Sequence, residues 1–244
     1  MTTLLAAEGL CRRYGSLVAV DALDLRLDGG ERHAVIGPNG AGKTTLLDLL
    51  AGACRPDRGR ITFAGRDITG LGASRRARLG IGRTHQRPAV WPSLTTLDNV
   101  MLAGWYAHRR ARRRAVAVDL LERVGLGSGG LGSGGLAAAP AASLSHGQRR
   151  QLEIAMALAG APRLILFDEP AAGLSPAERR ELVALLRSLP AHMSFVLIEH
   201  DLDIALRVVE RVTVMHNGRV LRTGTPAEIE NDAQVQAIYM GGKH

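Results

Sequence analysis

Lysine is almost absent from this sequence of 244 residues: of its 31 basic residues, 29 are arginine and only Lys43 and Lys243 are lysine. Aromatic residues are also scarce, at 3%, so the core has to consist mainly of aliphatic side chains. The two cysteines predict no disulfide framework and favour a reducing compartment. Because no uninterrupted apolar run reaches about 18 residues, no membrane span is expected. The N-terminus also lacks a charged-then-apolar export signal.

Acidic residues are outnumbered, 23 against 31 basic ones, which gives a net charge of +8 and a pI of about 10.6. Such a surface favours polyanions, and nucleic acid and anionic lipid headgroups are both candidates. The basic clusters contain few aromatic residues for base stacking, so nucleic acid is the less favoured partner. The densest cluster, residues 109–114, is interpreted as a solvated helix face. An arginine-rich composition without any specific partner is the alternative explanation.

The lysine in the interior of the chain, Lys43, lies in a glycine-rich segment that matches the phosphate-loop pattern G-x-x-x-x-G-K-[ST]. Glycines let successive backbone N–H groups turn inward around phosphate oxygens. A compact ammonium reaches the β and γ phosphates, where a planar guanidinium fits poorly. The Thr44 hydroxyl can ligate Mg²⁺. The segment therefore predicts nucleotide binding by these residues: Gly37, Pro38, Asn39, Gly40, Ala41, Gly42, Lys43, Thr44 and Thr45.

The surroundings of the segment favour the motif over coincidence. Residues 34–36 are expected to form a short buried strand and residues 46–50 a helix. Strand, glycine loop and helix is the arrangement that the motif needs, with the positive end of the helix pointing at the anion. A glycine-rich turn that matches by accident is expected in on the order of one percent of chains this long.

Two acids follow a second apolar run, residues 164–167. A buried strand there delivers Asp168 and Glu169 to the sheet edge beside the phosphate loop. Asp168 is then placed to hold Mg²⁺ through water, and Glu169 to polarise the attacking water. A strand followed by an acidic turn is common, but a phosphate loop upstream makes the catalytic interpretation the stronger one.

The remaining elements follow from periodicity and turn residues. Alternating segments predict strands at 4–7, 17–20, 23–27 and 61–63. Helical periodicity predicts helices within 93–124, 148–159, 176–189 and 202–209. Continuous apolar runs predict buried parallel strands at 164–167 and 195–198. A C-terminal hairpin, 212–215 with 219–221, is expected to turn at Asn217-Gly218. A repeated Gly-Ser segment over 126–135 predicts a flexible linker.

Residues 144–148, Leu-Ser-His-Gly-Gln, open a predicted helix that Ser145 is suited to cap. Together with the loop and the acids, they make the chain similar, over essentially its whole length, to the ATPase subunits of ABC transporters. In that family L-S-G-G-Q is the signature motif. Ser145, Gly147 and Gln148 fit it, and His146 replaces the first glycine, which leaves the backbone less free. The resemblance implies that these residues complete the ATP site of a second subunit.

The resemblance also assigns roles to single residues. Tyr14 matches the aromatic that stacks on adenine, although a core tyrosine is the alternative. Gln86 matches the glutamine that touches Mg²⁺ and senses the transmembrane partner. His200 matches the switch histidine at the γ-phosphate, although a lone histidine is more often structural. Ser175 stands where many relatives have aspartate, so the loop 172–175, which the resemblance links to intersubunit coupling, departs from the family pattern at this position.

The implied fold class is α/β: a P-loop NTPase with a RecA-like core and antiparallel β subdomain, plus an inserted α-helical signature subdomain. The implied division is a core of residues 1–87 and 159–244 and a helical part of residues 88–158, all within one ATPase domain. Five segments resemble the ATPases of branched-chain amino acid importers, a pattern that urea and short-chain amide importers share: residues 80–84, 94–100, 148–155, 171–174 and 238–241.

The resemblance therefore implies an ATPase that uses ATP and Mg²⁺ to drive import of branched-chain amino acids or a related small polar solute. The implied partners are a second ATPase subunit, identical or paralogous, two transmembrane permease subunits and, indirectly, an extracytoplasmic solute-binding protein. The implied location is the cytoplasmic face of the membrane. Two alternatives remain: the ATPase of a lipid or lipopolysaccharide exporter, and a soluble ABC protein acting on nucleic acid or ribosomes. The second usually carries tandem ATPase domains or a long coiled coil, which this chain lacks.

Overall fold

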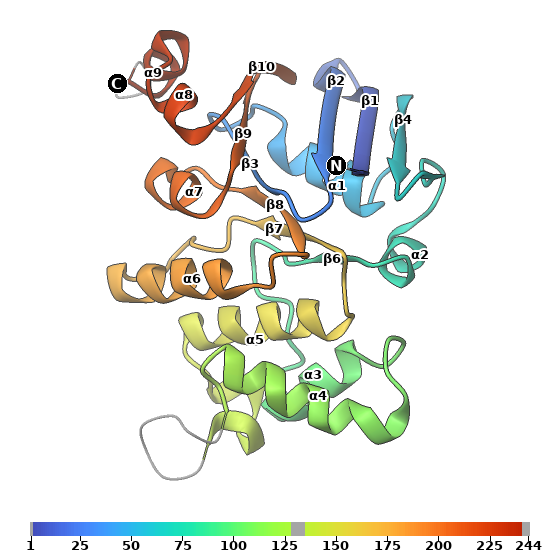
Figure 1. Cartoon of the computed structure of the whole chain (residues 1–244), viewed down its shortest axis with the longest axis vertical. Helices are drawn as coiled ribbons and strands as arrows, with labels where there is room; N and C mark the ends of the chain where they lie inside the picture. Colours follow the sequence, from blue (N-terminus) through green and yellow to red (C-terminus); the bar gives the residue numbers. More distant parts are fainter. Residues whose placement is uncertain (1, 128–134, 241–244) are drawn as a thin grey trace. The chain divides into compact units, whose positions relative to one another are not determined.

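The computed structural model of the chain describes residues 2–127 and 135–240 (Figure 1). They form two compact units: one comprises Met1–Arg76, Leu166–Glu169 and Pro190–His244, and the other Ala77–Ile165 and Pro170–Leu189. Most of the predicted Gly-Ser linker and the final residues, 241–244, lie outside the described ranges. Residues 88–158 fall within the second unit, and their division as a signature subdomain stays a prediction.

An antiparallel sheet in the first unit accounts for the alternating segments near the N-terminus. Its strands, in the order β2-β1-β4-β5, are β1 Thr3–Tyr14, β2 Leu17–Asp28, β4 Arg58–Phe63 and β5 Arg66–Asp67. Leu23, Leu25 and Leu27 are buried at alternate positions of β2 because one face of the strand packs on the core. The predicted segments 17–20 and 23–27 belong to one strand, since the irregularity at Ala22, with a φ of 47°, interrupts the register without ending the pairing with β1.

A second sheet carries the predicted buried strands and has the order β10-β9-β3-β8-β7-β6. Its strands are β3 Arg32–Ile36, β6 Ile81–Arg83, β7 Leu164–Asp168, β8 Ser194–Ile198, β9 Arg211–His216 and β10 Arg219–Gly224. Strand β3 runs parallel to both β8 and β9. In such a sheet, loops at the carboxyl ends of parallel strands form binding sites. The hairpin of β9 and β10 turns at Asn217 and Gly218, with φ of 50° and 77°, as predicted.

Side-chain caps start most of the helices. The helices are α1 Lys43–Ala51, α2 Ala73–Arg78, α3 Thr96–Ala103, α4 Arg110–Arg123, α5 His146–Ala159, α6 Pro176–Ser188, α7 Leu202–Val208, α8 Pro226–Glu230 and α9 Ala233–Met240, with 3-10 turns at Leu136–Ala138 and Ala141–Ser143. The capping residues of α3, α5, α6, α7 and α8 are Thr95, Ser145, Ser175, Asp201 and Thr225. Each supplies an oxygen to an N–H that has no partner within the helix. In the second unit, α3 and α4 pack against α5.

Helix α2 is an element that the sequence pattern does not indicate, because its buried side chain is charged. Arg76 is 1% exposed, and its Nη1 donates to the carbonyl oxygens of Leu49 at 2.6 Å and Leu50 at 2.8 Å. These are among the last carbonyls of α1, which have no partner within that helix. Burial lowers the pKa of Arg76 to about 10. Arg76 thus closes the C-terminal end of the helix that follows the phosphate loop.

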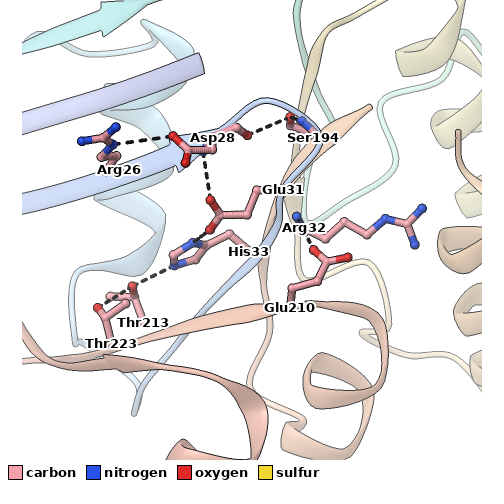
Figure 2. A network of polar contacts seen from close by, with 10 residues as sticks. Arg26, Asp28, Glu31, Arg32, His33, Ser194, Glu210, Thr213 and Thr223 are labelled. Carbon is pink, nitrogen blue, oxygen red and sulfur yellow. Dashed lines mark hydrogen bonds and ion pairs between the residues drawn. The ribbon is translucent and has the colours of Figure 1, made fainter. Parts of the chain in front are cut away.

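A polar network fixes the start of β3, the strand that leads into the phosphate loop (Figure 2). His33 is 1% exposed, with Nδ1 2.9 Å from Oε1 of Glu31 and Nε2 2.8 Å from Oγ1 of Thr213. A further hydrogen bond joins the Thr213 hydroxyl to the Thr223 hydroxyl, 2.9 Å away. These contacts join β3 to β9 and β10 and hold the strand from which the loop departs.

Candidate nucleotide-binding site

The phosphate loop leaves β3 and enters α1 through a tight path that only glycine can follow at two positions. Gly42 has a φ of 98°, and a Cβ there would collide with the carbonyl oxygen of Ala19. Gly37 has a φ of 153°, and a Cβ there would collide with the carbonyl oxygen of Met215. Both the backbone conformation and the close approach of neighbouring strands therefore require glycine.

Helix α1 differs from its capped neighbours because its N-cap, Gly42, has no side chain to offer. The backbone N–H groups of its first turn therefore lack a capping oxygen, and its first turn contains no acidic residue. Backbone donors at the positive end of a helix, next to a glycine loop, form an anion site. The local geometry therefore suits a phosphate group.

Lys43 lies inside this loop and is 5% exposed. Its Nζ donates to the carbonyl oxygens of Gly37 at 2.7 Å and Pro38 at 3.0 Å. Burial lowers the pKa of the ammonium, and the negative charges of Glu169 and Asp168 partly counteract that effect. The structure therefore brings the lysine, the loop and the two acids close enough together to interact electrostatically.

The two acids occupy the end of β7 and the residue after it. Asp168 is 4% exposed, whereas Glu169 has left the strand with a φ of 45° and donates its N–H to the carbonyl oxygen of Ile198 at 3.0 Å. A positive φ is costly for a residue with a long side chain and persists where surrounding contacts enforce it. The main-chain bond to the end of β8 supplies such a contact.

His200 and a residue that the sequence reasoning missed complete this group. Nδ1 of His200 lies 3.9 Å from Oε2 of Glu169 and 3.9 Å from Oε2 of Glu199. Glu199 is fully buried, while the His200 side chain is 54% exposed. The signal for Glu199 was present, because it follows the apolar run of β8 just as Asp168 ends that of β7. The structure therefore brings Lys43, Asp168, Glu169 and His200 together in the first unit.

Tyr14 ends β1 and is 46% exposed, so it is not a core tyrosine. The guanidinium carbon of Arg12 lies 4.8 Å from the centre of its ring, and its hydroxyl lies 4.0 Å from Sγ of Cys54. Stacking on one face supports the ring while much of its surface stays accessible. This exposure is compatible with the aromatic platform predicted for it.

The signature segment lies in the second unit at the start of α5. Oγ of Ser145 accepts from the N–H of Gln148 at 3.2 Å, and Oε1 of Gln148 accepts from the N–H of Ser145 at 2.9 Å. A Cβ on Gly147 would meet the carboxylate end of Glu178, whose side chain would then have to move. His146 lies close to Gly173, so the loop before α6 limits its space.

Ser175, which departs from the aspartate of many relatives, starts α6. Its Oγ accepts from the N–H of Glu178 at 3.3 Å, and the Glu178 carboxylate accepts from the N–H of Ser175 at 2.8 Å. This reciprocal pair is a capping box. The serine therefore has a structural function that needs no second subunit.

A buried ion pair on α5 holds the backbone around Gln86, and the sequence reasoning did not identify it. Arg150 and Glu153 are 1% and 3% exposed and lie 2.7 Å apart. Arg150 donates to the carbonyl oxygens of His85 at 2.5 Å and Gln86 at 2.6 Å. Glu153 accepts from the N–H groups of His85 at 2.7 Å and Ala89 at 3.4 Å, and burial nevertheless raises its pKa. We call Arg150 and Glu153 the α5 clamp.

The glycine loop before α1, the acids at the strand ends and the mainly parallel sheet define a phosphate-loop nucleotide-binding domain. The sequence pattern of the ABC transporter family matches residues 20–172, and the chain belongs to this family. It is an ATP-binding, ATP-hydrolysing subunit of the kind that ABC transporters use. The predicted family, fold class and enzymatic activity are confirmed.

Proteins of known name and structure are similar to this chain over nearly its full length. The high-affinity branched-chain amino acid transport ATP-binding protein LivG of Salmonella typhimurium is 37% identical, covering 98% of each chain. The lipopolysaccharide export system ATP-binding protein LptB of Acidithiobacillus ferridurans is 38% identical, covering 99% of this chain and 98% of its own. The ADP conformation of MJ1267, an ATP-binding cassette of an ABC transporter, has a TM-score of 0.86 at 29% identity, covering 99% of this chain and 100% of its own.

Proposed function

We propose that the chain drives import of branched-chain amino acids or a related small polar solute through partner permeases. The observation that carries this proposal is full-length similarity to LivG, joined by BraF of Pseudomonas aeruginosa, a branched-chain amino acid transport ATP-binding protein that is 35% identical over 98% of each chain. The importer-like segments named above also support import. One of them, residues 148–155 on α5, contains both members of the α5 clamp.

In the proposed site, the loop residues 37–45 and Lys43 hold the phosphates of ATP, and the exposed ring of Tyr14 stacks on adenine. Glu169 polarises the attacking water, and His200, 3.9 Å from its carboxylate, contacts the γ-phosphate and stabilises charge there. Ser145, Gly147 and Gln148 complete the site of a partner subunit.

Mg²⁺ fits this donor set. Thr44 is exposed beside Lys43, and the Asp168 carboxylate lies at the carboxyl end of β7 in the same unit. Hydroxyl and carboxylate oxygens are ligands that Mg²⁺ accepts, so Thr44 and Asp168 are the proposed ligands of the first unit. Gln86 belongs to the second unit and is proposed as a ligand on the family resemblance alone. When bound, the ion would neutralise phosphate charge during transfer.

The proposed assembly contains a second ATPase subunit, two permease subunits and, indirectly, a solute-binding protein, at the cytoplasmic face of the membrane. No helix among the described residues is long and apolar enough to cross a bilayer. Dimerisation is supported by MJ0796, a bacterial ABC transporter cassette solved as a dimer, with a TM-score of 0.81 at 25% identity, covering 91% of this chain and 99% of its own. Trp91, 45% exposed, is the proposed anchor of the permease contact.

Uptake of labelled leucine, isoleucine and valine by cells lacking the gene tests the import proposal. Uptake should fall, and the wild-type gene should restore it, whereas a gene encoding Lys43→Ala should not. Unchanged amino acid uptake together with mislocalised lipopolysaccharide would contradict import and favour the export function named for LptB.

A further inference from the structure

One end of α4 carries a concentration of exposed arginine and aromatic side chains. We call the following residues the basic-aromatic patch: Trp105, Tyr106, Arg109, Arg110, Arg112 and Arg114. Trp105 is 63% exposed and Tyr106 47%, and the four arginines are also exposed. The guanidinium carbon of Arg113 lies 4.1 Å from the centre of the Trp105 ring, which ties Trp105 to the helix. All these residues belong to the second unit.

The arrangement of charge in the patch works against the stability of the helix. The N-terminus of a helix has a positive partial charge, so arginines there are unfavourable. The first turn of α4 contains no acid, and Arg109, its N-cap, forms no capping bond. Like charges also recur four residues apart, at Arg110 and Arg114, which is a repulsive spacing. A stabilising role therefore does not explain the cluster.

Within the described part of the chain, no carboxylate neutralises the four arginines of the patch. On α4, Asp119 pairs with Arg123 at 2.9 Å, toward the other end of the helix. Arg113 is directed to the carbonyl oxygen of His108 at 3.1 Å and to the Trp105 ring. The exposed guanidinium groups of the patch are therefore available to an anionic partner.

We propose that the basic-aromatic patch binds the surface of an anionic phospholipid membrane. Guanidinium groups form paired hydrogen bonds with phosphate oxygens, and anionic headgroups supply a counter-charge. Exposed tryptophan and tyrosine prefer the headgroup region of a bilayer, where one part of the ring is apolar and another is wet. The patch supplies both signals at one helix end, and the proposal does not depend on which solute is transported.

Nucleic acid offers the same phosphates but fits the patch less well. Binding to single strands relies on aromatic faces on which bases stack. Arg113 already covers one face of Trp105. Binding to a lipid surface does not require a free ring face, because in the headgroup region the Trp105 ring acts as an amphipathic anchor.

Vesicle co-sedimentation of the full chain tests the proposal, with phosphatidylcholine vesicles that contain or lack phosphatidylglycerol. The patch variant replaces Arg109, Arg110, Arg112 and Arg114 with glutamine, and we expect its affinity for anionic vesicles to fall by ~10-fold or more. The matched control removes the same charge from exposed arginines of the first unit: Arg55→Gln, Arg58→Gln, Arg66→Gln and Arg75→Gln. The control should bind nearly as well as the wild type.

A Trp105→Ser variant should also weaken vesicle binding, and its loss should persist at high salt, where the arginine contribution is screened. Equal losses in the patch and control variants would overturn the proposal, because net charge alone would then explain binding. So would a patch variant that loses affinity for a duplex or single-stranded oligonucleotide but keeps it for vesicles.

Hydrogen exchange of the wild-type chain provides a measurement that does not depend on the folding of any variant. We expect anionic vesicles, but not pure phosphatidylcholine vesicles, to slow exchange across residues 105–114. Protection elsewhere without protection of this segment would contradict the assignment.

Discussion

Lys43 has to satisfy a steric condition as well as an electrostatic one. Its ammonium sits between two loop carbonyls within 3.0 Å, at 5% exposure. A planar guanidinium directs its donors in a fixed fork and occupies more width than an ammonium. A chain that uses arginine almost everywhere therefore keeps lysine at the position where the loop encloses the charge.

Lys43→Arg should consequently reduce affinity for Mg-ATP by at least ~10-fold, although the charge is retained. Titration calorimetry measures the affinity directly. Lys243→Arg changes the other lysine in the same way and should leave the affinity unchanged. Wild-type affinity in the Lys43→Arg chain would show that the loop tolerates the wider group.

Glu169 combines a strained backbone with a half-buried side chain beside His200, so its side chain is held for a purpose other than packing. Glu169→Gln retains the shape and removes the base. We expect ATP binding to persist while hydrolysis slows by ~100-fold or more. Steady-state phosphate release measures the rate, and Glu181→Gln on the exposed face of α6 is the matched control. Near-normal turnover would remove Glu169 from the proposed role.

Glu31 makes the stability of the first unit depend on pH. Burial raises the pKa of its carboxyl, but the hydrogen bonds from His33 and from the N–H of Asp28, with the nearby charge of Arg211, outweigh burial, so the pKa lies below its ordinary value. A lowered folded-state pKa stabilises the fold above the unfolded-state pKa of about 4.3, and this contribution is lost as the pH falls through the folded-state value.

Glu31→Gln should therefore lower the free energy of unfolding by ~1 kcal/mol at neutral pH, with the difference from the wild type shrinking below about pH 4. Glutamine has one acceptor oxygen, so it can keep the hydrogen bond from His33 or the one from the N–H of Asp28, but not both. The part of the difference that changes with pH therefore reports the charge. Urea unfolding across this pH range measures it. A difference that stays constant down to the lowest pH would show that the carboxylate charge contributes nothing.

At the scale of elements, the α5 clamp joins the helix of the signature segment to the backbone around Gln86. Its two side chains supply four hydrogen bonds to that backbone, through His85, Gln86 and Ala89. Both side chains are buried, so each needs the other to offset the loss of hydration. A shift of α5 would therefore be transmitted to the segment that contains Gln86. This makes Arg150 and Glu153 positioning residues within the proposed function.

Glu153→Ala leaves Arg150 buried without its acid and should lower the free energy of unfolding by about 3–5 kcal/mol. The double variant Arg150→Met with Glu153→Leu should recover much of that loss, because it removes both charges. It should keep ATP binding, because the proposed phosphate contacts of Lys43 lie in the first unit, but lose stimulation of hydrolysis by permease and substrate. Full stimulation in a stable double variant would show that the clamp acts only in folding.

Elements with a strong local signal were predictable, and those fixed by distant contacts were not. The apolar runs of β7 and β8 and the glycine loop before α1 are readable because burial and backbone geometry impose the residue type directly. By contrast, α2 is stabilised by Arg76 capping another helix, and the α5 clamp joins residues that lie 64 and 65 positions apart. No local periodicity records such contacts, so an arginine or a glutamate in a helix looks like a surface residue.

At the scale of the whole molecule, the two units divide the proposed ATP chemistry between them. The first contains the phosphate loop, the acids and His200, and the second contains Gln86 and the signature residues. If each signature segment completes a partner's site, ATP forms part of the contact between subunits. Thermodynamic linkage then requires ATP to strengthen association.

A Glu169→Gln chain, which should retain ATP, is therefore expected to associate roughly 10- to 100-fold more tightly with Mg-ATP than without it. Light scattering over a concentration series measures the shift from monomer to dimer. The double variant Lys43→Ala with Glu169→Gln is the control, because it should lose the phosphate contact and remain monomeric. If the Glu169→Gln chain binds ATP and still stays monomeric at every concentration, self-association is excluded. The signature residues would then have to face a paralogous subunit, and mixing the chain with that paralogue should restore the ATP-dependent dimer.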